Sequence, residues 1–65
     1  MHYQVRVRGQ LSKTMLAAFP ELRAQVLRSE TLLTGHLPDQ AALFGVLDRV
    51  EALGLDLLEV FRAED

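Results

Sequence analysis

The sequence predicts an α+β fold, in which a four-stranded antiparallel sheet is covered on one face by two helices. Residues His2–Arg8 alternate between polar and apolar side chains, as a half-buried strand does. Two further extended runs, Leu22–Arg28 and Thr31–Leu37, flank a short polar turn. The segment after Asp39 has apolar residues at helical spacing and ends at a glycine. One domain, residues 1–65, with the element order βαββαβ is therefore expected.

The first half of the chain predicts a strand followed by a helix. The strand His2–Arg8 ends at Gly9, and its apolar residues share one face: Tyr3, Val5 and Val7. A helix is expected over Leu11–Phe19, because apolar residues recur there at helical spacing and Ser12 can cap the amino end. Pro20 disfavours helical geometry at the residue before it, so the helix is expected to end there.

The two middle runs predict a hairpin centred on Ser29-Glu30. A two-residue loop and a four-residue loop at this point give the same register. The pairs expected on one face are Val26 with Leu33, Ala24 with Gly35 and Leu22 with Leu37. The pairs expected on the other face are Leu27 with Leu32, Gln25 with Thr34 and Arg23 with His36. The first face is apolar and is expected to contact the helices.

The second helix has the clearest pattern in the chain. It is expected to begin at Pro38-Asp39, because the Asp39 carboxylate can accept the free amide donors of the first turn. Gly54 supplies the left-handed residue that ends helices. The apolar residues between them share one stripe: Leu43, Val46, Leu47, Val50 and Leu53. A last strand is expected over Leu55–Arg62, with Leu58 and Val60 directed to the core, and a frayed tail over Ala63–Asp65.

The compact right-handed arrangement of these elements is the ferredoxin-like fold, with strand order 4-1-3-2. In this topology the first strand runs antiparallel to both the third and the fourth. Arg8 is therefore expected to lie toward Leu32 and Leu57, and Arg6 toward Glu59.

Composition narrows the classes of function. A chain with 49% hydrophobic and 25% charged residues is globular, and the absence of cysteine removes disulfides, thiolate catalysis and the usual structural zinc sites. No secretion signal and no run of 18 apolar residues occurs, so a cytoplasmic location without membrane spanning is expected. A net charge of -2 gives no overall attraction to phosphate backbones, and the first and third strands put no aromatic residue on the open face, so nucleic acid is not an expected partner.

The face of the sheet opposite the helices is the candidate interaction surface. Leu27, Leu32 and Leu57 are expected to gather at one end of this open face, and Phe61 at the other. Charged residues of the same face would give the contact specificity: Arg6, Arg8 and Glu59. The simpler interpretation is that a few leucines on a solvated sheet need no explanation. Four large apolar groups on one face of so small a domain favour an interface.

Two polar constellations offer weaker alternatives. His2 and His36 are expected at the same end of the open face, where they are the only candidates for a metal or a pH sensor; solvated surface histidines are the simpler interpretation. Arg6 and Arg8 precede a predicted helix, so an anion could meet both, although strand-face arginines paired with Glu59 are simpler. Neither a cofactor nor a resident metal is expected.

The βαββαβ order and the segment T-G-H-L-P-D-Q-A-A-L-F-G-V-L-D-R-V-E-A-L-G-L-D-L-L-E-V resemble those of short uncharacterised proteins of high-GC bacteria. The chain also resembles the ACT-like group of small ferredoxin-like regulatory domains. That resemblance implies self-association and a metabolite, such as an amino acid, held between subunits near the loop after the first strand. The loop here, Arg8-Gly9-Gln10-Leu11, has the glycine of the ACT pattern but lacks its acidic residue.

Three hypotheses of function follow. The leading one is a non-enzymatic module that forms a homodimer or higher homo-oligomer and presents a surface to another protein. The alternative is an ACT-like sensor of a small metabolite bound between subunits. A small enzyme that uses Arg6, Arg8 or His36 ranks last, because no catalytic motif, no nucleophile paired with a base and no pair of carboxylates can be assembled from the sequence.

Overall fold

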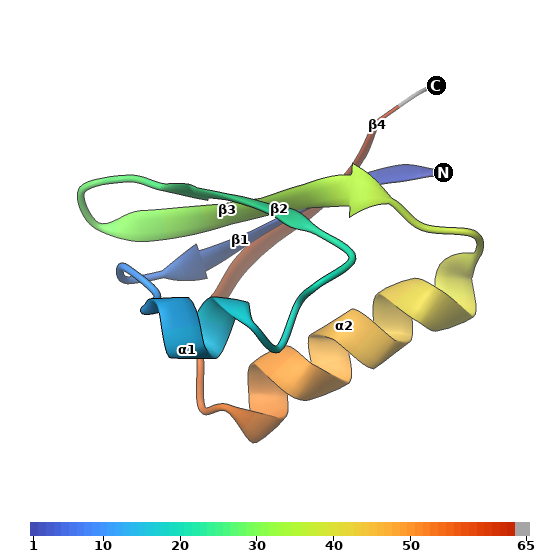
Figure 1. Ribbon diagram of the computed structural model, residues 1–65. Helices are drawn as coiled ribbons and strands as arrows, with labels where there is room; N and C mark the ends of the chain where they lie inside the picture. Colours follow the sequence, from blue (N-terminus) through green and yellow to red (C-terminus); the bar gives the residue numbers. More distant parts are fainter. Residues whose placement is uncertain (64–65) are drawn as a thin grey trace.

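A computed structural model describes residues 1–63 and shows the predicted α+β fold (Figure 1). The elements are β1 (His2–Arg8), α1 (Lys13–Leu16), β2 (Arg23–Val26), β3 (Glu30–His36), α2 (Gln40–Ala52) and β4 (Leu57–Ala63). The four strands form one antiparallel sheet in the order β2-β3-β1-β4, which is the predicted order 4-1-3-2 read from the other edge. Both helices lie on the same side of this sheet.

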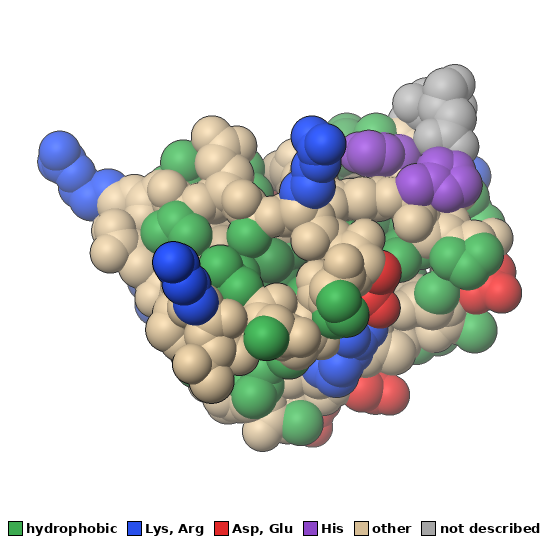
Figure 2. Space-filling view, viewed as in Figure 1, with side chains coloured by type: hydrophobic (Ala, Val, Ile, Leu, Met, Phe, Trp, Pro, Cys, Tyr) green, Lys and Arg blue, Asp and Glu red, His purple; other side chains and the backbone are tan. Residues whose placement is uncertain are grey.

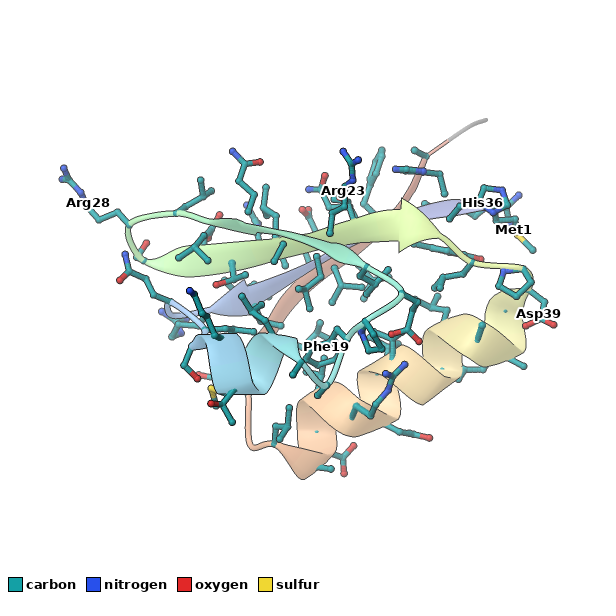
Figure 3. The ribbon with its side chains drawn as sticks, in the orientation of Figure 1. Met1, Phe19, Arg23, Arg28, His36 and Asp39 are labelled. Atoms are coloured by element: carbon teal, nitrogen blue, oxygen red, sulfur yellow. The ribbon has the colours of Figure 1, made fainter. Side chains whose placement is uncertain are left out.

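Helix α1 is shorter than the predicted Leu11–Phe19. The Ser12 side chain caps it by accepting the Met15 amide at 3.2 Å. After Leu16 the chain continues in turns, because the amides of Ala18 and Phe19 donate to carbonyls three residues earlier rather than four. This tight turn places the Phe19 ring in the core, where it is buried (Figure 3).

Helix α2 begins and ends where the sequence predicts. The Asp39 carboxylate accepts the Ala42 amide at 2.9 Å, and Gly54 has the left-handed backbone (φ 71°) expected after the last turn. Most of the stripe predicted to face the sheet does so, with Leu43, Val46 and Val50 buried and Leu47 partly buried. Leu53, at the end of the stripe, is instead 40% exposed.

The predicted register of the β2–β3 hairpin is wrong by two residues. Val26 lies opposite Thr31 rather than Leu33, and Ala24 lies opposite Leu33 rather than Gly35. The turn is one residue earlier than predicted, because the Leu27 amide donates to the Glu30 carbonyl at 2.8 Å. A slip of two residues preserves the two faces, so the apolar side still contacts the helices.

Strand β4 contains a β-bulge that the sequence does not reveal. Glu59 lies opposite Arg6, as predicted, but Leu57 lies opposite Val7, so Leu58 is the extra residue. Val7 is fully buried on the helix side of the sheet, and Leu57 therefore shares that side instead of the open face. The strand runs to Ala63, and the rest of the predicted frayed tail lies outside the described residues.

The core fills the space between the sheet and the helices. It consists of Tyr3, Val5, Val7, Leu11, Phe19, Leu33, Leu37, Leu43, Val46 and Val50. Every residue of β2 is exposed, and β4 is exposed along nearly its whole length, so the helices cover the two central strands and leave both edges open. None of the helices in residues 1–63 is long and apolar enough to cross a membrane.

Candidate functional site

The centre of the open face is a charged cluster around Arg6. Its guanidinium lies 3.6 Å from Glu30 on one neighbouring strand and 3.6 Å from Glu59 on the other. The buried Nε atom of Arg6 has no hydrogen-bond partner among residues 1–63. One arginine thus bridges β3, β1 and β4 across the middle of the sheet, and it pairs with Glu59 as the alternation predicts.

Arg8 lies at the end of β1, away from the leucines expected beside it. It is opposite Glu30, and its side chain reaches Asp56 at 3.4 Å. Both groups of this ion pair are well exposed, so the pair contributes little stability. The carboxylates beside Arg6 and Arg8 occupy the positions that a bound anion would need. This favours the interpretation of both residues as strand-face arginines in ion pairs over that of an anion site.

The predicted cluster of three leucines on the open face does not form. Leu32 is on that face, opposite Arg6 and Gln25, and is half-buried. Leu27 is half-buried beside the hairpin turn, and the bulge moves Leu57 to the helix side. The prediction for Leu57 was wrong because an extra residue in a strand cannot be read from an alternating pattern.

The exposed apolar side chains instead gather along β4. Leu57, Leu58, Val60 and Phe61 have exposed fractions between 36% and 55%. Phe61 is opposite Gln4 on the open face, whereas Val60 is opposite Val5 on the helix side. An edge strand that exposes apolar groups on both faces is a template for pairing with another chain. The sequence signal for this exposed edge strand is the nearly continuous apolar run of residues 57–61. The prediction of strict alternation along the strand divided that run between the core and the open face.

Helix α2 is tied by Arg49 to the segment that precedes β2. Arg49 donates to both carboxylate oxygens of Glu21, at 3.0 and 2.7 Å, and to the Ala18 carbonyl at 2.5 Å. Its guanidinium also lies 5.5 Å from the centre of the Phe19 ring, a cation–π contact. These contacts hold α2 against the loop that leads from α1 into β2.

The Arg49 ion pair changes the titration of both groups. The hydrogen bond from Arg49 lowers the pKa of Glu21, and the same bond raises the pKa of Arg49. The residues of α2 on the far side from Arg49 follow the spacing i, i+3, i+7 and are Phe44, Leu47 and Glu51. Phe44 is more than half exposed. The uncovered side of α2 therefore adds exposed apolar surface on the helix side of the molecule.

The two histidines meet at the end of the open face, as predicted. His2 lies directly opposite His36, and Figure 2 shows the two rings side by side. The His36 Nε2 atom is 3.0 Å from the amino group of Met1, at the end of the molecule seen in Figure 3. No group of three metal-ligating side chains occurs within residues 1–63. The weak metal candidate gains no third ligand from the fold.

The fold and this surface define a small α+β protein built from two βαβ units. The two strands of each unit are separated in the sheet by one strand of the other unit. Residues 2–61 match the family model described as Domain of unknown function (DUF8691), and the chain belongs to that family. No curated protein matches the chain. No solved structure matches it either. The comparisons give no support to the narrower ACT-like resemblance.

Proposed function

We propose that this protein is a non-enzymatic module that self-associates and acts through protein contacts. One observation carries the proposal: β4 is an edge strand of seven residues that exposes large apolar side chains on both faces of the sheet. Soluble proteins usually protect such an edge with charge, proline or a covering segment. Association would protect it here.

The size of the domain gives the proposal a thermodynamic reason. A chain of 65 residues buries a smaller share of its surface than a larger domain does, and here the core is concentrated over β1 and β3. Burial of the apolar side chains of β4 against a partner would add to a core that is small. The proposed surface differs from the open-face interface predicted from the sequence. Phe61 belongs to both surfaces, whereas Leu27 and Leu32 lie outside β4 and are half-buried.

A metabolite-sensing function has less support. The loop after β1, where the ACT-like resemblance would place a ligand, already uses its polar groups within the chain. The Thr31 hydroxyl donates to the Gly9 carbonyl at 2.8 Å and accepts the Leu11 amide at 3.2 Å. The Gln10 side chain donates to the Leu27 carbonyl at 3.0 Å. These bonds leave fewer free donors for an amino-acid carboxylate.

Light scattering coupled to size exclusion tests self-association. We expect the apparent mass to rise from monomer toward dimer, or beyond, as the protein concentration is raised from low to high micromolar. A strict monomer at high micromolar concentration would contradict the proposal. A thermal-shift screen against amino acids separates the sensor alternative, since a ligand at 100 times its dissociation constant adds about 2.7 kcal/mol of stability.

The substitution Leu32→Asp asks whether the open face takes part. Leu32 lies near the centre of that face and away from β4, so a dimer formed through the edge strand should tolerate this change. Association through stacked open faces should be lost, because two buried carboxylates would face each other. Circular dichroism on the same samples confirms that the variant is folded.

A further inference from the structure

The hydrogen bonds of β1 show which backbone groups of β4 are free. The Arg8 amide donates to Asp56 on the β4 side, and the next amide, of Gly9, donates to Ser29 on the β3 side. Because these directions alternate along a strand, the even-numbered residues of β1 direct their backbone groups to β4. Their partners Glu59 and Phe61 are therefore bonded inward. Val60 and Arg62 turn their amides and carbonyls to the open edge.

We propose that β4 of a second copy of this chain pairs antiparallel with β4 along this edge, around a two-fold axis at Val60. Four strands from each copy would then form one continuous sheet of eight. This inference rests on the proposed function and adds its geometry. Its chemistry is a ladder of backbone hydrogen bonds from outward-facing amides, reinforced by apolar contacts on both faces.

Charge selects the register. The outward-facing backbone amides and carbonyls of one copy must lie opposite the outward-facing groups of the other copy. Two-fold axes at Glu59, Val60 or Phe61 satisfy this condition. An axis at Glu59 places that carboxylate directly opposite its own copy, and like charges in this position repel. An axis at Phe61 extends the pairing beyond Arg62 and leaves Leu58 without a partner in residues 57–63. An axis at Val60 pairs Val60 with its copy, Leu58 with Arg62 and Glu59 with Phe61, so that no two like charges are opposed.

The same register brings together two charges that lack an ion-pair partner within residues 1–63. Arg62 and Glu51 make no ion pair among residues 1–63. They lie at opposite ends of the α2–β4 face, since α2 runs antiparallel to β4 (Figure 1). Pairing around Val60 places Arg62 of the second copy over Leu58, at the end where α2 carries Glu51 on its uncovered side. A second copy therefore supplies the charge that this end of the face lacks.

A matched pair of substitutions tests the edge. Val60→Lys places a charge opposite its own copy, and we expect the dimer dissociation constant to rise about tenfold or more. Val26→Lys is the control: this valine is 45% exposed on the helix side of the other edge strand, compared with 38% for Val60. Equal dissociation constants for the two folded variants would overturn the proposal.

Charge reversal tests the register without touching the core. Arg62→Glu and Glu51→Arg should each weaken association, because each places like charges together at both ends of the interface. An equimolar mixture of the two variants should associate as well as the unsubstituted protein, since every contact then joins opposite charges. The register would be wrong if each folded variant associates normally alone, or if their mixture associates no better than either variant.

Hydrogen exchange separates this inference from the proposed function. As protein concentration rises, the amides of Val60 and Arg62 should gain protection, while those of Glu59 and Phe61 are protected throughout by β1. If the protein associates but the outward amides stay unprotected, the edge geometry is wrong and self-association still holds. If the protein is a monomer at high micromolar concentration, both fail.

Discussion

At the residue scale, Thr31 is the polar group on which the first half of the fold depends. Its side chain is fully buried, and its hydroxyl joins β3 to the loop after β1 through bonds to Gly9 and Leu11. Thr31→Val keeps the shape but removes the partner of the part-buried Gly9 carbonyl and of the buried Leu11 amide. We expect a loss of about 1–3 kcal/mol in the free energy of unfolding, measured by urea denaturation. Thr14→Val, at an exposed position of α1, should change it by less than about 0.5 kcal/mol.

Two glycines should respond to alanine with opposite signs. A Cβ atom at Gly35 would lie 2.9 Å from the Leu22 side chain and 3.0 Å from the Glu21 carbonyl, so Gly35→Ala forces the chain before β2 away from β3. We expect a loss of about 1–3 kcal/mol of stability. Gly45 in α2 has open space around it, and Gly45→Ala should add about 0.5–1 kcal/mol by helix propensity. Equal effects in chemical denaturation would contradict this account of Gly35.

At the element scale, the bond between α2 and the loop before β2 depends on pH. Arg49 lowers the pKa of Glu21 in the folded chain, so the ionised carboxylate favours folding above its ordinary unfolded pKa of about 4.3. This contribution is lost as the pH falls through the lowered pKa. Both side chains are more than a third exposed, which limits the contribution to about 1 kcal/mol or less.

The substitution Glu21→Gln measures this contribution. The variant should unfold at a lower temperature than the unsubstituted protein at pH 7, and the difference should diminish as the pH falls through the lowered pKa of Glu21, because the carboxyl then becomes protonated in the folded state as well. Asp48→Asn, in α2 and without an ion pair among residues 1–63, is the control and should show no such difference at pH 7. A difference for Glu21→Gln that persists in acid would assign the effect to packing instead.

At the scale of the whole molecule, self-association makes stability depend on concentration. If folded copies bind each other through β4, the midpoint of thermal unfolding should rise with protein concentration, because association removes folded monomer from the unfolding equilibrium. Val60→Lys should abolish this dependence and Val26→Lys should retain it. A midpoint independent of concentration in the unsubstituted protein would count against association at those concentrations.

Local patterns were sufficient to predict the order of the elements and the buried sides of β1, β3 and α2. The alternation of β1 and the stripe between Asp39 and Gly54 each repeat with one period, so the buried side of each element follows directly. The opposition of Arg6 to Glu59 followed from strand parity and the topology. The metal candidate at His2 and His36 was placed correctly in space, although proximity alone gave it no further ligand.

The candidate site was harder to predict, because its location depends on two features that local patterns do not encode. The hairpin turn lies one residue earlier than predicted, because the Leu27 amide donates to the Glu30 carbonyl. This difference changes the residue of β2 that lies opposite Leu32. The bulge at Leu58 turned Leu57 away from the open face. Both choices depend on which backbone groups find partners across the sheet, which is a property of pairs of strands.

The sequence by itself determined the class of fold, the order of the strands and the apolar sides of β1, β3 and α2, because these follow from periodicity and from the handedness of chain connections. Only the tertiary structure decided which apolar side chains stay exposed. The contacts of Arg49 hold α2 toward Glu21, and β4 is left at the edge with Val60 and Phe61 uncovered. Coverage depends on how far a helix of fixed width extends over a sheet, and that distance is set by contacts between residues remote in the chain.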